Sequence, residues 1–325
     1  MRDREKIRVP ETLLEAARVF ADKDVCVEFV AAMRWPNGVV CPHCKGKEHS
    51  FLTTRRIWKC RKCQKQFSVK SGSIFEDSPI PLDKWLMAVW LVVNCKNGVS
   101  SYEIARDLKV TQKSAWFMLH RIRLAMKGGS WEKLGGSGPK EVDEAFIGGT
   151  PKFMHAKRRM GLGYGIGGRT AKVPVLGMLD RESRQVRAQV VPNIKRETLQ
   201  NAILQEIETG STIYTDNSST LDTLAAKGYV HDTVNHIEEY VRGQVHTQGI
   251  ENFWSLLKRG LKGTYIAVEP FHLDRYVGEQ VFRFNNRATK DNPLNDADRF
   301  MLAVSQISGK RLTYAELTGK AARPA

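Results

Sequence analysis

The sequence predicts a multi-domain chain of the α+β class. Two Cys-x-x-Cys pairs lie near the N-terminus, a purely helical pattern follows them, and strands alternate with helices in the second half. With 325 residues, the chain is long enough to form two or three domains. The predicted boundaries are an N-terminal helical segment at 1–36, a cysteine module at 37–72, a helical domain at 73–128, a linker at 129–139, an α/β domain at 140–290 and a C-terminal tail at 291–325.

The charge of the chain indicates an acidic polymer as its partner. The formal net charge is +16, and nucleic acid is the commonest partner of such a protein. The alternative is a basic protein whose charge serves only solubility. The residues after Met1 contain no apolar signal region, and the longest apolar run, Trp85 to Val93, is too short to cross a bilayer. We therefore expect a cytoplasmic protein with reduced thiols and no membrane partner.

The N-terminal part predicts helices followed by a zinc site. Residues 11–34 place apolar side chains on one helical face. Fifteen residues separate the two Cys-x-x-Cys pairs, and this spacing presents four thiolates to a structural Zn²⁺ ion: Cys41, Cys44, Cys60 and Cys63. Redox chemistry is the alternative, but the second matched pair argues against it. Because many lysines and arginines surround the cysteines, we expect this module to contact DNA; a purely structural role is the alternative.

Residues 79–127 show a helical pattern only. Ser100 and Glu103 predict a capping box for a short helix, and Thr111 caps a second helix that extends to about Met126. The apolar side chains of the second helix predict an outer face with four residues: Lys113, Phe117, His120 and Arg121. Two helices joined by a tight turn are typical of a helix-turn-helix domain that contacts DNA, here through Lys113 and Arg121. A small helical bundle without a DNA role is the alternative.

The second half predicts strands first and then alternating helices and strands. Strands are expected at 141–147, 173–179, 185–191, 212–216 and 230–235, and helices at 195–208 and 218–227. Residues 152–172 are rich in glycine and basic residues but lack the Gly-Lys-Ser/Thr of a nucleotide-binding loop. We expect a mobile loop that contacts DNA phosphates through Lys157, Arg158, Arg159 and Arg169. The alternative is a disordered segment without a DNA role.

Three carboxylates lie at informative positions in this half. Asp143 lies in the first strand, Asp216 ends the strand 212–216, and Glu251 lies near the start of a helix with a continuous apolar stripe. Lys258 lies two turns after Glu251 on the same edge of that helix, and Lys262 follows one turn later. Taken singly, Asp216 is better explained as a helix cap, and Glu251 with Lys258 as a solvated helix edge.

With these motifs, the chain resembles a bacterial insertion-sequence transposase of the DDE type that carries an N-terminal zinc ribbon. The resemblance extends from the Cys-x-x-Cys pairs to Phe284-Asn285-Asn286-Arg287 and is most specific at Val142-Asp143-Glu144 and from Glu251 to Gly263. It implies a ribonuclease H-like fold for residues 140–290. Some relatives replace the third acid with asparagine, so Asn252 is the alternative to Glu251. Relatives also often have tyrosine where this chain has Phe146.

The resemblance implies metal-dependent cutting and joining of DNA. Asp143, Asp216 and Glu251 would hold two Mg²⁺ or Mn²⁺ ions about 3.5 to 4 Å apart. Lys258 would bind the phosphate beside the cut bond, and Arg259 and Lys262 would add DNA contacts. The expected partners are double-stranded DNA, both as terminal inverted repeats and as target, and further copies of the chain in a homodimer or larger assembly. The alternatives are a non-catalytic DNA-binding regulator and a ribonuclease H-like metal nuclease.

Overall fold

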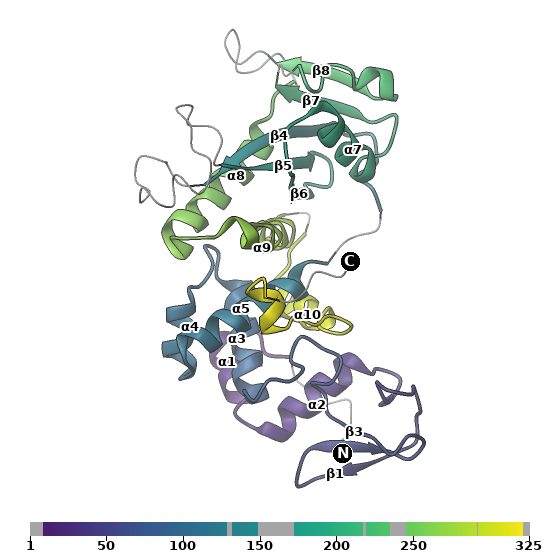
Figure 1. Cartoon of the computed structure of the whole chain (residues 1–325), viewed down its shortest axis with the longest axis vertical. Helices are drawn as coiled ribbons and strands as arrows, with labels where there is room; N and C mark the ends of the chain where they lie inside the picture. Colours follow the sequence, from purple (N-terminus) through teal and green to yellow (C-terminus); the bar gives the residue numbers. More distant parts are fainter. Residues whose placement is uncertain are drawn as a thin grey trace. The chain divides into compact units, whose positions relative to one another are not determined.

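The computed structural model describes residues 9–128, 132–148, 172–216, 219–234, 245–290 and 292–320. The chain divides into two compact units: residues 1–128 with 286–325 form the first, and residues 129–285 form the second (Figure 1). Helices dominate the first unit, and a mixed sheet with helices forms the second. The predicted α+β class is therefore confirmed. None of the described helices has both the length and the hydropathy that a membrane span requires.

The first unit combines a helical core with a small three-stranded sheet. The sheet has the order β1-β2-β3 and is antiparallel: β1 is His49–Leu52, β2 is Ile57–Cys60 and β3 is Gln66–Phe67. The helices are α1 Leu13–Val19, α2 Lys23–Arg34, α3 Leu82–Asn94, α4 Ser101–Leu108, α5 Gln112–Met126, α10 Asp296–Ser305 and α11 Tyr314–Leu317. The buried Trp58 of β2 stacks on Phe67 of β3, so this sheet has an aromatic core of its own.

The predicted start signals of α4 and α5 are confirmed. Ser100 accepts a hydrogen bond from the N–H of Glu103, whose carboxylate accepts one from the N–H of Ser100. Thr111 caps α5 by accepting a hydrogen bond from the N–H of Ser114. Lys109 to Thr111 joins the two helices, as expected for a helix-turn-helix.

The predicted outer face of α5 is wrong in part. Arg121 is 4% exposed, and its guanidinium donates hydrogen bonds to the carbonyls of Leu312, Ile74 and Glu76. His120 is also fully buried. The reason is that chain distant in sequence covers this side of the helix, which helical periodicity cannot reveal. Arg121 therefore holds the C-terminal segment against α5 instead of facing solvent.

The segment expected to form a C-terminal tail is folded into the first unit. Phe300 of α10 is fully buried, with ring centroids 5.7 Å from Phe20, 5.7 Å from Phe29 and 5.2 Å from Trp90. Helix α10 thus completes a core that also uses α2 and α3. The domain boundaries drawn from the sequence remain a prediction, but residues 292–320 pack as part of a unit.

The second unit is built on a five-stranded sheet of order β6-β5-β4-β7-β8. The strands are β4 Lys140–Ile147, β5 Val173–Asp180, β6 Val186–Val190, β7 Thr212–Asp216 and β8 Val230–Val234. β4, β5 and β6 pair antiparallel, whereas β7 pairs parallel with both β4 and β8. Three antiparallel strands followed by two parallel ones form the mixed sheet of a ribonuclease H-like fold.

Helices cover both faces of this sheet. α7 Arg196–Glu206 packs on the face that carries Val142 and Ile213, whereas α8 Gln248–Gly260 and α9 Leu273–Asn285 pack on the face that carries Ala145 and Val175 (Figure 1). Because side chains alternate along a strand, Asp143 lies on the same face as Ala145, toward α8. The sheet therefore places this acid under the helix that carries Glu251.

One predicted helix of the second unit is absent from the described residues. Residues 219–227, expected to be helical, form turns and the 3₁₀ helix η3 Ala225–Lys227. The Gln200 side chain of α7 donates hydrogen bonds to the Thr220 carbonyl and the Thr223 hydroxyl. These tertiary hydrogen bonds satisfy polar groups of the segment without the regular hydrogen bonds of an α-helix.

We expect Phe300→Ala to lower the free energy of unfolding of the first unit by about 3–5 kcal/mol, because it leaves a cavity among three aromatic rings. Leu302→Ala is the matched control on the same helix, since Leu302 is 37% exposed, and it should cost only about 0.5 kcal/mol. Urea unfolding followed by tryptophan fluorescence measures both variants. Equal losses would contradict the role assigned to α10.

Candidate active site and metal centre

The strand register brings two of the three predicted acids side by side. In the parallel pair, Lys140 lies opposite Ile213 and Val142 opposite Thr215, so the next positions, Asp143 and Asp216, are neighbours. Both acids lie on the α8 face and are partly exposed. Two carboxylates on adjacent strands at one edge of the α8 interface form the base of the site.

Thr247 links the third acid to this pair. Its hydroxyl lies 3.0 Å from Glu251 Oε1 and 3.2 Å from Asp216 Oδ1, and Thr247 is fully buried. The two carboxylates, from α8 and from β7, thus contact the same hydroxyl oxygen. Asn252, the alternative to Glu251, is exposed on the next position of the helix. The geometry therefore favours Glu251 over Asn252 as the third acid beside Asp143 and Asp216.

Trp254 ties Asp143 to the same helix. The indole Nε1 donates a hydrogen bond of 2.9 Å to Asp143 Oδ2, and the backbone N–H of Glu144 donates one of 2.8 Å to Asp143 Oδ1. The ring of Trp254 lies against Gly177, which pairs with Asp143 across β4 and β5. A Cβ at Gly177 would overlap the indole ring, so glycine is required for this close approach.

Glu141 fixes the start of α8. Thr247 makes no side-chain cap, and the carboxylate of Glu141 from β4 instead accepts a 2.8 Å hydrogen bond from the N–H of Ile250. Glu141 is 1% exposed and pairs with Arg181 Nε at 2.6 Å. Arg181 also donates to the carbonyl of His246 at 2.6 Å. A carboxylate at the helix N-terminus satisfies the free backbone N–H groups and interacts favourably with the helix dipole.

Partial burial, together with the crowding of acids, raises the pKa of two carboxyl groups at the site. Burial is the largest cause of a rise in the pKa of Asp143 to about 6, and the charges of Asp216 and Glu251 add to it. Burial and the charge of Asp143 raise the pKa of Glu144 to about 7. Among the described residues, Glu144 Oε1 is buried without a hydrogen-bond partner. A divalent cation would relieve this repulsion, and carboxylate oxygens are the ligands that Mg²⁺ prefers.

Apart from the buried Arg121, the predicted basic residues fall into two groups. Lys258, Arg259 and Lys262 are exposed along α8 and the π-helix η4 Leu261–Tyr265, and Lys113 is exposed near the start of α5. The phosphate-binding loop expected through Lys157, Arg158, Arg159 and Arg169 lies outside the described residues.

The apolar stripe of α8 predicts the buried position of Trp254 but not its bond to Asp143, and no pattern in the sequence assigns a role to Glu141, Arg181 or Thr247. Glu141 was visible only as a residue on the same strand face as Asp143, and Arg181 as part of a turn. Their roles depend on β4, β5 and α8 meeting, which a local pattern does not encode. Asp222, a nearby acid, pairs instead with Arg196 at 3.0 Å on the surface.

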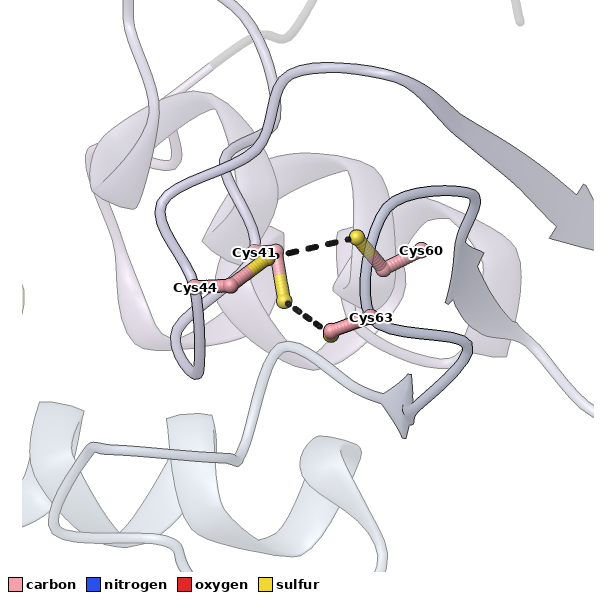
Figure 2. A group of neighbouring side chains, drawn as sticks. All are labelled: Cys41, Cys44, Cys60 and Cys63. Atoms are coloured by element: carbon pink, nitrogen blue, oxygen red, sulfur yellow. Dashed lines mark hydrogen bonds between the residues drawn. The ribbon is translucent and has the colours of Figure 1, made fainter.

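The four predicted zinc ligands lie together beside the small sheet of the first unit, at the end of β2 and in the loops next to it (Figure 2). All four Sγ atoms lie within 4.8 Å of one another; Cys41 and Cys63 are 3.7 Å apart, and Cys44 and Cys60 are 3.5 Å apart. A tetrahedral Zn²⁺ with Zn–S bonds of about 2.3 Å requires S···S separations of about 3.8 Å. In the metal-free cluster the N–H of Cys63 is the main cause of a lowered pKa of Cys60, about 7, whereas the pKa of Cys44 is raised to about 11, because burial and the other three thiols outweigh the N–H of Gly46. The donor set therefore fits zinc.

We expect the chain to bind one zinc ion at the four cysteines. Cys60→Ser should lose the ion and unfold β1–β3, because coordination by the thiolates is the main link between the two Cys-x-x-Cys pairs. Metal content and amide hydrogen exchange of this sheet measure the effect. Cys95→Ser, outside the cluster, is the control and should keep both the metal and slow exchange. Full zinc occupancy in Cys60→Ser would contradict the site.

We expect Asp143→Asn to raise the stability of the metal-free protein at pH 8. The folded-state pKa of about 6 exceeds the ordinary aspartate pKa of 3.8, so the ionised carboxylate costs stability as the pH rises from about 4 through 6. The cost reaches at most about 3 kcal/mol. Thermal unfolding in chelator should show the gain at pH 8 and none at pH 4, whereas Asp222→Asn should change little at either pH. A stability difference between Asp143→Asn and wild type that is the same at pH 4 and pH 8 would contradict the electrostatic cause.

Comparison with known proteins identifies both regions. Residues 135–285 match the ISXO2-like transposase domain, and residues 21–66 match the transposase zinc-ribbon domain. The chain is 24% identical over 254 residues to an uncharacterized protein in transposable element ISH50 of Halobacterium salinarum, covering 75% of this chain and 85% of that protein. It is 32% identical over 101 residues to an uncharacterized transposase-like protein of Haemophilus influenzae, covering 31% of this chain and 81% of that protein.

Two solved structures give weaker likenesses. The HTLV-2 integrase catalytic core domain in complex with magnesium aligns over 51% of this chain and 97% of its own, with a TM-score of 0.29 and 13% identity. The simian T-cell lymphotropic virus intasome in complex with PP2A regulatory subunit B56 gamma aligns over 57% of this chain and 63% of its own, with a TM-score of 0.29 and 17% identity. These scores do not decide the fold. The matched domains and relatives do decide the family: the chain belongs to the insertion-sequence DDE transposases that carry an N-terminal zinc ribbon.

Proposed function

We propose that the second unit of this transposase cuts and joins DNA strands with divalent metal ions held by Asp143, Asp216 and Glu251. The observation that supports this best is the shared contact of Thr247 with Asp216 and Glu251, beside Asp143 on the neighbouring strand. All three acids are at least partly exposed, so a DNA phosphate can reach them. Structural acids with no catalytic role would not need to gather against their own repulsion.

The metal ions would be Mg²⁺ or Mn²⁺, for which three carboxylates are a suitable donor set. Two such ions, when bound, make the attacking oxygen more nucleophilic and stabilise the leaving oxygen. The chain supplies the orientation. Trp254 and the N–H of Glu144 hold the Asp143 carboxylate, and Glu141 and Arg181 hold the helix that carries Glu251.

Lys258 would bind the phosphate beside the cut bond. It lies two helical turns after Glu251 on the same edge of α8 and is exposed, so a strand that passes the acids continues past its ammonium group. Arg259 and Lys262 extend this basic edge. An ammonium group lowers the repulsion between acids and phosphate without competing as a metal ligand.

The first unit would bind the terminal inverted repeats. The zinc ribbon carries exposed basic residues such as Lys59 on β2 and Lys62 in the turn after it, and α5 presents Lys113 at its exposed start. Residues 1–128 and 286–325 hold 31 of the 51 Lys and Arg residues and 17 of the 35 Asp and Glu residues, so their net charge of +14 supports a polyanionic partner for the first unit. We expect two copies of the chain or more on paired DNA ends, because joining one element requires both of its ends.

We expect Asp216→Asn and Glu251→Gln to lower strand transfer at least about 10³-fold, because each removes a charged ligand. The assay uses labelled duplexes that carry the repeats flanking the gene, a plasmid target and Mg²⁺. Asp222→Asn, an exposed acid of the same unit, is the control and should keep near-normal activity.

Two outcomes would overturn the proposed function. Wild-type protein that binds the repeats but never cleaves them would identify a DNA-binding regulator. Cleavage of RNA–DNA hybrids in preference to the repeats would identify a ribonuclease H-like nuclease.

A further inference from the structure

The chain makes a strained turn directly after the basic end of α8. Ile266 has φ 60° and ψ −58°, and the N–H of Ala267 donates to the carbonyl of Tyr265 at 2.6 Å. This is a γ-turn of the form that is rare for L-amino acids and least suited to a β-branched side chain. The turn follows a π-helix, a second irregular feature that is frequent at functional positions.

The turn exposes apolar side chains although its neighbours are firmly anchored. We call residues 264–271 the Ile266 loop. Ile266 is 82% exposed and Phe271 60% exposed, whereas the Tyr265 ring lies 4.8 Å from that of Tyr276 and Val268 packs on the core under α8 and α9. The Tyr265 hydroxyl also contacts the buried Glu279. The strained turn therefore does not bury Ile266; instead, the anchored neighbouring residues keep the Ile266 side chain exposed to solvent.

The surroundings of the loop favour a polyanion as its partner. The exposed Lys258, Arg259 and Lys262 precede it on the same helical edge, and Glu269 is the one acid within residues 258–271. Lys262 lies eleven residues after Glu251, which is about 16 Å along a helix. That length corresponds to about five base-pair steps of duplex DNA at about 3.4 Å each.

We propose that the Ile266 loop contacts DNA bases, with Ile266 inserted as an apolar wedge at a base step about five base pairs or more from the cut bond. This inference rests on the proposed function, because the bound duplex is the one held at the acids. Lys258, Arg259 and Lys262 bind the neighbouring phosphates, and Phe271 lies against the displaced base. Inserted apolar side chains unstack and kink DNA, which would give selectivity for deformable steps without hydrogen bonds to the bases.

The test uses Ile266→Gly in the full chain. Glycine accepts the backbone angles of this turn and removes the wedge, so the variant should fold at least as stably as wild type. Duplexes that end in the flanking repeat carry 2-aminopurine at one position each, and its fluorescence rises when the base unstacks. Binding is measured without divalent metal, so the readout does not require cleavage. Ile194→Ala is the matched control, since Ile194 is a 43% exposed isoleucine elsewhere in this unit.

We expect wild type and Ile194→Ala to brighten one or two adjacent positions on binding, and Ile266→Gly to lose about nine-tenths of that rise while keeping its affinity within about threefold. Equal brightening by Ile266→Gly and wild type would overturn the wedge, even if wild type cleaves the same duplex. No brightening by wild type would do so as well. Loss of self-association alone in Ile266→Gly would assign the loop to a second copy of the chain and overturn the proposal. Failure of wild type to bind the duplex would overturn both the wedge and the proposed function.

Discussion

The attachment of α8 to the sheet is the constraint on which the candidate active site depends. Two different interactions fix this helix: the Trp254 indole packs against Gly177, and the buried Glu141 carboxylate accepts a hydrogen bond from the first turn. The apolar contact sets the rotation of the helix about its axis, and the carboxylate sets its position along that axis. Glu251 follows Ile250, whose N–H is held, so the place of the third acid is a consequence of both contacts.

Electrostatics explains why neutral donors hold the acids of the site. Elsewhere in the sheet, cations neutralise buried acids: Glu141 pairs with Arg181, and Asp180 pairs with Lys140. Around the candidate site, the Thr247 hydroxyl and the Trp254 indole orient carboxylates instead. A neutral donor fixes the geometry of a carboxylate and leaves its negative charge available to a cation. Burial and the charges of Asp216 and Glu251 raise the pKa of Asp143 to about 6 in the metal-free protein, although the Glu144 N–H and the Trp254 indole lower it.

The first unit shows how distant chain changes the role of a residue. Arg121 has the spacing of an exposed helix residue, yet three carbonyls from segments near 75 and 312 surround its guanidinium. The same C-terminal segment carries Phe300 into the aromatic core. Both findings have one cause: residues 292–320 return to the N-terminal helices, and the apolar stripe of α10 needs a partner surface to bury.

The sequence by itself determined the elements that depend on neighbouring residues. Cysteine spacing specified the ligands of the ribbon, the Ser100 capping box specified the start of α4, and alternation specified β4 and its inward-facing Asp143. These features follow from local geometry, which a short stretch of chain encodes completely. Only the tertiary structure decided that Asp143 and Asp216 lie on neighbouring strands, that Thr247 links Asp216 to Glu251, that Glu141 caps α8, and that Arg121 is buried. Those outcomes depend on strand order and helix docking, which join residues that no local period relates.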